Sequence, residues 1–209
     1  LQEKHITVGL KPDARVFDIL VRATSGGHTA VTRIADRHTN VAEVELDGHI
    51  QQRSDLCEEN CAVDPDEELL TIEGIFDFAR TCDTGDVAEV LDRQIEYNTA
   101  IAKEGLSGRW GAAVGKVLLD SYGDADVRVR ARAYAAAGSD ARMAGCEMPV
   151  IINSGSGNQG ITVSLPIIEY AKELNATHEQ LLRALALGNL VAIRVKALIG
   201  YLSAFCGAI

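Results

Sequence analysis

The chain has 209 residues, of which 47% are hydrophobic and 24% charged, and its formal net charge at pH 7 is −10. This composition is typical of a protein with one large or two small domains that buries a hydrophobic core. The negative charge would repel a phosphate backbone, so we expect no nucleic-acid partner. No apolar run reaches the roughly 18 residues that span a bilayer and no leader is recognisable, so we expect no membrane partner and a cytoplasmic location.

The first fifty residues alternate between apolar and polar positions, as β-strands do. Short β-rich runs, separated by turn residues, lie at 5–10, 15–23, 29–35, 40–46 and 49–50. The pair Asp47-Gly48 is typical of a tight hairpin turn. This pattern predicts a mainly antiparallel sheet within residues 1–56.

An acidic, irregular stretch at residues 57–67 follows the predicted sheet and indicates a domain boundary. Beyond it, apolar residues recur at helical spacing and predict helices over 68–81, 86–105, 111–122, 127–137, 161–174 and 179–199. Thr177 and Gln180 have the spacing of a capping box that starts the last of these helices. The fold class is therefore α+β, an N-terminal antiparallel β-sheet followed by a mostly helical region, 68–209, with a Gly-rich binding loop.

Residues 149–160 combine a short apolar run with a loop made almost only of Gly, Ser, Asn and Gln. Its glycines permit backbone conformations and a close approach that a Cβ would forbid. The helix predicted from Ile161 onward would direct free N–H groups and a positive dipole end at a ligand. An anion such as a carboxylate suits this loop best, and the candidate substrate-binding residues are Ser154, Ser156, Gly157, Asn158 and Gln159.

Other interpretations of this loop stay open. The spacing Gly155-x-Gly157-x-x-Gly160 fits the fingerprint of a dinucleotide-binding oxidoreductase, which also requires a second parallel strand after the helix. Residues 175–180 predict the start of another helix instead. A phosphate-binding P-loop fails because Ile161-Thr162 stands where Lys-Ser/Thr is required. The loop could also be a plain turn, or it could serve a noncatalytic amino-acid-binding or regulatory protein without metal.

Single cysteine, histidine and arginine residues are less informative. Five cysteines without a leader argue against a disulfide framework and leave thiol or metal chemistry open. Cys206 lies in an apolar segment, where composition alone favours a buried small side chain. His28 lies beside a turn among polar residues. A local basic cluster is interpreted as solvated surface, and its members are Arg128, Arg130, Arg132 and Arg142.

Five segments in chain order carry a resemblance to a known family: SGGHT at 25–29, RHTN at 37–40, DARMAG at 140–145, NSGSGNQG at 153–160 and LSAFCGA at 202–208. They resemble the iron–sulfur L-serine dehydratase alpha-chain superfamily, and most of all its L-cysteine desulfidase-like branch. The resemblance implies an α,β-elimination on a small L-amino acid. L-cysteine would give pyruvate, ammonia and sulfide, and L-serine would give pyruvate and ammonia.

The resemblance also implies a [4Fe-4S] cluster in the full-length protein, held by three cysteines, whose open iron acts as a Lewis acid. Cys206 matches one of these ligands, whereas the other cysteines, Cys57, Cys61, Cys82 and Cys146, match none. The family's N-terminal catalytic cysteine and two further cluster cysteines have no counterpart here. We therefore expect a chain truncated at both ends that holds no intact cluster, because one thiolate cannot bind four irons.

The catalytic residues are only partly assigned by this resemblance. His28 is the candidate within the chain, since the family's catalytic cysteine has no counterpart. The 209 residues alone are expected to lack activity. We also expect a homo-oligomer, or association with the segments that the chain lacks.

Overall fold

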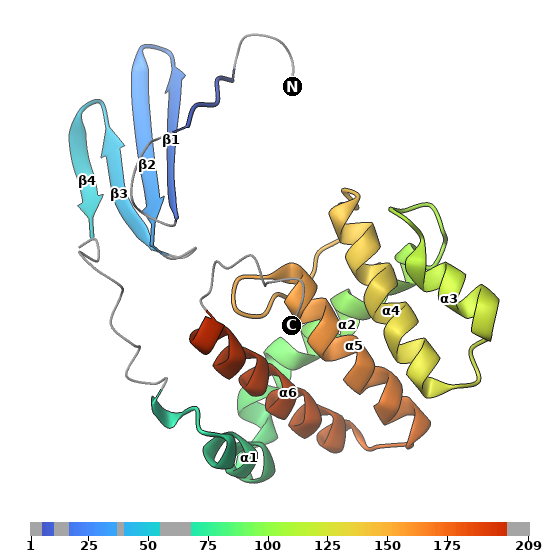
Figure 1. Ribbon diagram of the computed structural model, residues 1–209. Helices are drawn as coiled ribbons and strands as arrows, with labels where there is room; N and C mark the ends of the chain where they lie inside the picture. Colours follow the sequence, from blue (N-terminus) through green and yellow to red (C-terminus); the bar gives the residue numbers. More distant parts are fainter. Residues whose placement is uncertain (1–5, 11–16, 37–39, 55–67, 200–209) are drawn as a thin grey trace. The chain divides into compact units, whose positions relative to one another are not determined.

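The computed structural model describes residues 6–10, 17–36, 40–54 and 68–199 (Figure 1). The chain divides into two compact units, one within residues 1–62 and the other within 63–209. Among the described residues, the first contains a four-stranded antiparallel sheet and the second contains six helices, so the α+β class is confirmed. None of the described helices is long and apolar enough to cross a membrane.

The sheet is a meander in which each strand pairs with its neighbour in sequence. Its strands are β1 (Asp18–Ser25), β2 (His28–Ala35), β3 (Val41–Leu46) and β4 (His49–Arg53). Gly26-Gly27 and Asp47-Gly48 form two-residue turns in which all four residues have positive φ, between 52° and 83°. This is the conformation of type I′ hairpins, and it explains why Gly and Asp occupy these positions.

The sheet is smaller than predicted at its N-terminal end. Residues 6–10 were expected to be a strand, but they pair with no strand in the described part of the chain. Val8 and Leu10 are both exposed. Alternating apolar residues form a stable strand only when they pair with another strand and bury one face, and among the described residues this segment does neither.

Most helices lie close to the predicted ranges. The helices are α1 (Ile72–Thr81), α2 (Thr84–Gly105), α3 (Val114–Tyr122), α4 (Val127–Met143), α5 (Gly157–Glu173) and α6 (His178–Ile199). Helix α4 continues six residues past its predicted end at residue 137. The predicted capping box starts α6, since the Thr177 N–H donates to Gln180 Oε1 (2.8 Å) and the Gln180 N–H donates to Thr177 Oγ1 (3.2 Å). No strand lies between residues 174 and 190, so the second strand that a dinucleotide-binding fold requires is absent there.

Helix α4 is built from small residues and packs against α2, α3 and α5 (Figure 1). Its buried positions are mostly alanines. A Cβ at Gly105 would lie 2.0 Å from the carbonyl oxygen of Ala137, and one at Gly115 would lie 2.2 Å from that of Ala133. Glycine is therefore required at both places, because the helices touch through their backbones. Larger side chains from α2, α5 and α6 fill the adjoining core, including Ile101, Ile161, Leu165 and Leu185.

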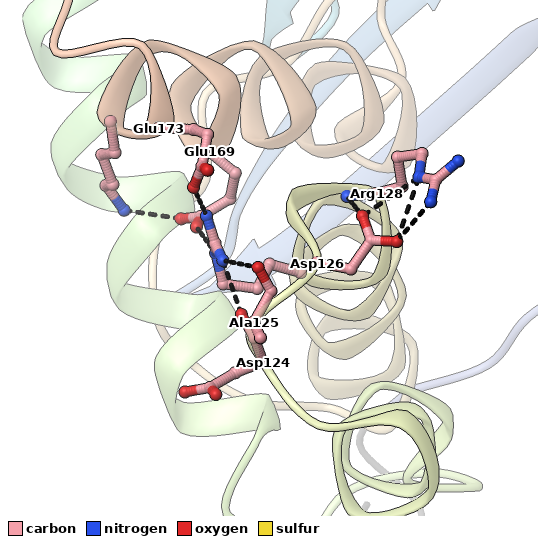
Figure 2. A network of polar contacts seen from close by, with 8 residues as sticks. Asp124, Ala125, Asp126, Arg128, Glu169 and Glu173 are labelled. Carbon is pink, nitrogen blue, oxygen red and sulfur yellow. Dashed lines mark hydrogen bonds and ion pairs between the residues drawn. The ribbon is translucent and has the colours of Figure 1, made fainter.

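A polar network ties the start of α4 to the end of α5 (Figure 2). Arg130 pairs with Glu173 (2.5 Å) and Glu169 (3.4 Å), and it donates to the carbonyl oxygen of Asp124 (2.5 Å). Glu169, whose side chain is only 4% exposed, also accepts from Lys172 (2.6 Å). A buried carboxylate is tolerated only with such partners. Arg130 was interpreted as solvated surface, and its side chain remains 19% exposed, but its ion pairs with α5 are contacts that helical periodicity cannot show.

Candidate functional site

The segment between α4 and α5 is held by a buried asparagine of α2. Asn98 Oδ1 accepts from the N–H of Ile151 (2.9 Å), and its Nδ2 donates to the carbonyl oxygens of Ile151 (3.2 Å) and Gly160 (3.1 Å) and to Ser164 Oγ (3.0 Å). Asn98 thus binds the backbone of residue 151 as a neighbouring strand would. A buried amide with every bond satisfied fixes one local geometry, because any displacement leaves a polar group unpaired.

A second set of amides fixes the turn that follows. Asn153 Nδ2 donates to the side-chain oxygen (2.9 Å) and to the carbonyl oxygen (3.1 Å) of Asn189 in α6. Asn189 in turn exchanges two hydrogen bonds with Gln94 of α2 (2.8 and 3.1 Å). The hydroxyl of Ser154 donates to Asn153 Oδ1 (2.9 Å). The turn before α5 is therefore attached to two helices that lie far from it in sequence.

These amides were not predicted from the sequence as site residues. A signal was present in α2, where the buried face continues through Leu91, Gln94, Asn98 and Ile101. Two amides on an otherwise apolar helical stripe indicate a buried polar network. The residues that they bind could not be deduced, since those contacts join positions more than 50 apart in the chain.

The turn itself is tight. Ser154 and Gly155 have φ of 47° and 78°, and the backbones of Asn153 and Ser156 exchange two hydrogen bonds (3.0 and 2.9 Å). Ser156 then caps α5, because its side chain accepts from the N–H of Gln159 (3.2 Å). With this cap the helix begins at Gly157, four residues before the predicted start. The prediction of a loop that extends to residue 160 is wrong in this respect, and Gly157, Asn158 and Gln159 belong to the first helical turn.

Two glycines in the first turn of α5 allow other groups to approach its backbone closely. A Cβ at Gly157 would lie 2.2 Å from Nε of Arg142, and a Cβ at Gly160 would lie 2.1 Å from the carbonyl oxygen of Ile151. Arg142, near the end of α4, also donates from Nη1 to Asn158 Oδ1 (3.2 Å). Gly157 therefore makes room for a guanidinium group at the start of α5.

The start of α5 carries uncompensated positive charge. No acidic residue lies in its first turn. Among the described residues Arg142 contacts no carboxylate; its guanidinium contacts Asn158 Oδ1 and, at 3.5 Å, the sulfur of Met143. A cation beside a helix N-terminus adds to the positive dipole end instead of offsetting it. The arrangement is suited to an anion, and a carboxylate could accept from both the guanidinium and the free N–H groups.

The predicted binding residues differ in what they can do. Asn158 lies beside Arg142, and Ser154 is half-buried in the turn. Gln159 is buried, and its Nε2 donates to the carbonyl oxygen of Ala192 in α6 (3.3 Å), while its Oε1 has no hydrogen-bond partner among the residues that the structure describes. Ser156 acts as the helix cap. Arg142 could not be predicted as a site residue, since nothing local to residue 142 indicates that it lies beside residue 157.

The sheet unit holds a histidine–aspartate pair. Nδ1 of His28, at the start of β2, lies 2.7 Å from Oδ2 of Asp47 in the β3–β4 turn. The other oxygen of Asp47 accepts from the backbone N–H of Thr29 (2.7 Å). These bonds, first that from Thr29 and then that from His28, hold the pKa of Asp47 below its ordinary value. The His28 side chain remains 74% exposed.

The cysteines give no metal site within the described residues. Cys206, the predicted cluster ligand, lies outside them, as do Cys57 and Cys61. Cys82 ends α1 and Cys146 follows α4, and both are half-buried free thiols. In the part of the chain that the structure describes, no group of three or more His, Cys, Asp or Glu side chains could hold a metal ion. The described residues therefore do not by themselves fit an iron–sulfur cluster.

Comparison with known proteins gives a family and several relatives. The profile of a family described as "Serine dehydratase alpha chain" matches residues 22–209. A UPF0597 protein of Desulfitobacterium hafniense is 49% identical over 209 residues, which are all of this chain and 48% of that protein. A UPF0597 protein of Lachnoclostridium phytofermentans is 50% identical over 193 residues, 91% of this chain and 45% of the relative.

A more distant relative is aligned over similar fractions of the two chains. A UPF0597 protein of Bacteroides thetaiotaomicron is 36% identical over 219 aligned positions, which span all of this chain and 49% of the relative. The chain thus spans about half the length of the curated relatives that it matches. No solved structure matches it.

Proposed function

Because the chain belongs to the serine dehydratase alpha chain family, we propose that the intact protein is a lyase that catalyses α,β-elimination on a small L-amino acid. L-cysteine would yield pyruvate, ammonia and sulfide, and L-serine would yield pyruvate and ammonia. The observation that supports this best is the positive start of α5, where Arg142 lies beside Gly157. Every α-amino acid offers a carboxylate to such a site.

The geometry suggests how the carboxylate would be held. Ser156 accepts the N–H of Gln159 with its side chain and that of Gly160 with its carbonyl oxygen. This leaves the N–H groups of Gly157 and Asn158, the first two of the helix, to a ligand. The guanidinium of Arg142 would add a charge-assisted bond. The amide network around Asn98 would keep these donors in place before the substrate arrives.

The proposal includes an iron–sulfur cluster because residues 202–208 resemble a family segment that contains a cluster ligand. We propose that Cys206 is one ligand of a [4Fe-4S] cluster in the intact protein, completed by cysteines from other segments or another subunit. Such a cluster supplies, when bound, a Lewis acid for the departing β-substituent. His28 is proposed to transfer the proton from Cα. A cytoplasmic location would suit an oxygen-sensitive cluster of this kind.

The test is an anaerobic preparation of the intact protein. We expect iron and acid-labile sulfide, and formation of pyruvate from L-cysteine, L-serine or both when they are assayed in parallel. Arg142→Gln should raise KM about 10- to 100-fold, as loss of a charged hydrogen bond implies. Arg128→Gln is the matched control, because Arg128 lies at the opposite end of α4 and pairs with Asp126.

Two results would contradict the proposal. Amino-acid binding that depends on Arg142, without pyruvate and without iron, would favour a noncatalytic amino-acid-binding or regulatory protein. Turnover with an unchanged KM in Arg142→Gln would leave the elimination standing and remove the start of α5 as the carboxylate site.

A further inference from the structure

The topology of the sheet brings together two side chains that are 19 positions apart in sequence. His28 follows the turn between β1 and β2, and Asp47 opens the turn between β3 and β4. In an antiparallel meander the first and third turns lie at the same end of the sheet, so both residues lie at that end. Asp47 uses its two oxygens separately, one for Thr29 N–H and one for His28 Nδ1.

This contact determines which nitrogen of His28 carries the proton. Asp47 is a carboxylate at neutral pH, since its hydrogen bonds lower its pKa further below an already acidic value. An ionised carboxylate only accepts hydrogen bonds. The Nδ1 of a neutral His28 must therefore carry the hydrogen, and Nε2 keeps its lone pair. With 74% of the side chain exposed, that lone pair is accessible to a proton donor.

We propose that Asp47 is a positioning residue that holds His28 in the tautomer and orientation in which Nε2 accepts a proton. This inference rests on the proposed elimination. In that step Nε2 would take the proton from Cα, and the electron pair of the C–H bond would form the Cα=Cβ double bond. The electron pair of the breaking Cβ–S or Cβ–O bond leaves with the substituent. The resulting enamine tautomerises to an imine, which water hydrolyses to pyruvate and ammonia.

The substitution Asp47→Asn tests this directly. Asn tolerates the left-handed backbone of this position, where φ is 52°, and its Oδ1 can still accept from Thr29 N–H. The turn should therefore be retained. The amide NH₂ would then face His28 Nδ1 and donate to it, which places the ring hydrogen on Nε2. The variant should invert the tautomer while the fold stays the same.

The readout is the ¹⁵N shifts and long-range ¹H–¹⁵N couplings of the imidazole ring, measured on the 209-residue chain above pH 8. We expect His28 to be mainly the Nδ1–H form in the parent chain and mainly the Nε2–H form in Asp47→Asn. Glu43→Gln is the matched control, an acid-to-amide change on the same sheet that removes the charge from the 2.9 Å pair with Arg53. It should leave His28 unchanged. A parent His28 in the Nε2–H form, or a tautomer that Asp47→Asn does not alter, would overturn the inference.

Turnover gives the second readout. In the intact protein Asp47→Asn should lower kcat about 100-fold with little change in KM, within the range that general acid–base groups contribute. If Asp47→Asn inverts the tautomer of His28 but leaves kcat unchanged, the His28–Asp47 pair has no part in turnover. If the parent protein forms no pyruvate at all, the proposed function fails, and the spectra still decide whether Asp47 sets the state of His28.

Discussion

Replacement of Asn98 by leucine should strongly destabilise the helical unit. Leucine has the same number and branching of side-chain heavy atoms but cannot form hydrogen bonds with the groups that Asn98 satisfies. The N–H and the carbonyl oxygen of Ile151 would both be left unpaired, whereas the carbonyl oxygen of Gly160 keeps its bond from Ser164 Oγ (2.7 Å). Each orphaned buried group costs about 1–3 kcal/mol, so we expect a loss of about 2–6 kcal/mol. That is a large share of the roughly 5–15 kcal/mol that stabilises a typical domain.

Urea unfolding followed by helical circular dichroism measures this loss. Gln94→Leu is the comparison, because its partner Asn189 keeps its bond to the carbonyl oxygen of Leu185 and its contacts with Asn153. We expect that variant to lose about 1–3 kcal/mol. Hydrogen exchange of the Ile151 amide should accelerate in Asn98→Leu beyond the change in global stability. A loss below about 1 kcal/mol, with Ile151 still protected, would refute the role given to Asn98.

Three further predictions concern the packing and charges of α4. The carboxyl of Asp126, which caps the helix and binds Arg128, should titrate at about 2, since the side-chain bond from Arg128 and then its backbone N–H lower the pKa. Its stabilising effect is full above the ordinary aspartate pKa of 3.8 and is lost as pH falls toward 2, and carboxyl ¹³C shifts in Arg128→Gln should show a higher midpoint. Gly105→Ala should destabilise by about 3 kcal/mol in urea unfolding, although alanine is the better helix former; a gain would contradict the backbone contact. Arg130→Leu should lower the midpoint of urea unfolding, because it leaves the buried Glu169 with one fewer cation, and adding Glu169→Leu should restore part of that loss.

The parts of the fold that depend on neighbouring residues were predictable from the sequence. The turn at Asp47-Gly48 and the capping box at Thr177 each join residues a few positions apart, so the local pattern contains the whole interaction. The α+β class follows from the change between two hydrophobic periods. The start of α5 was misplaced because a glycine-rich stretch predicts a loop by propensity, whereas the cap from Ser156 makes the helix begin there.

The segment that forms the candidate site was predictable from the sequence, but the arrangement of its side chains and of those around it was not. Ser154 to Gln159 stood out by composition, yet the group that gives the segment its charge, Arg142, belongs to another helix. Its proximity depends on how α4 packs against α5, which no local pattern contains. The pair of His28 and Asp47 depends in the same way on the order of strands in the sheet. Contacts between distant positions require the tertiary structure, and these are the contacts that give the site its chemistry.

The glycines of the helical unit differ in how a mutation could be repaired during evolution. At Gly188 an added Cβ would meet Cδ1 of Ile167 at 2.5 Å, so a smaller residue at position 167 could act as a second-site suppressor. At Gly105 the obstacle is the carbonyl oxygen of Ala137, an atom that every residue at position 137 would supply. No substitution of that partner can relieve the clash. A suppressor screen should therefore recover revertants of Gly188→Ala at position 167, and only true reversion or shifted helices for Gly105→Ala.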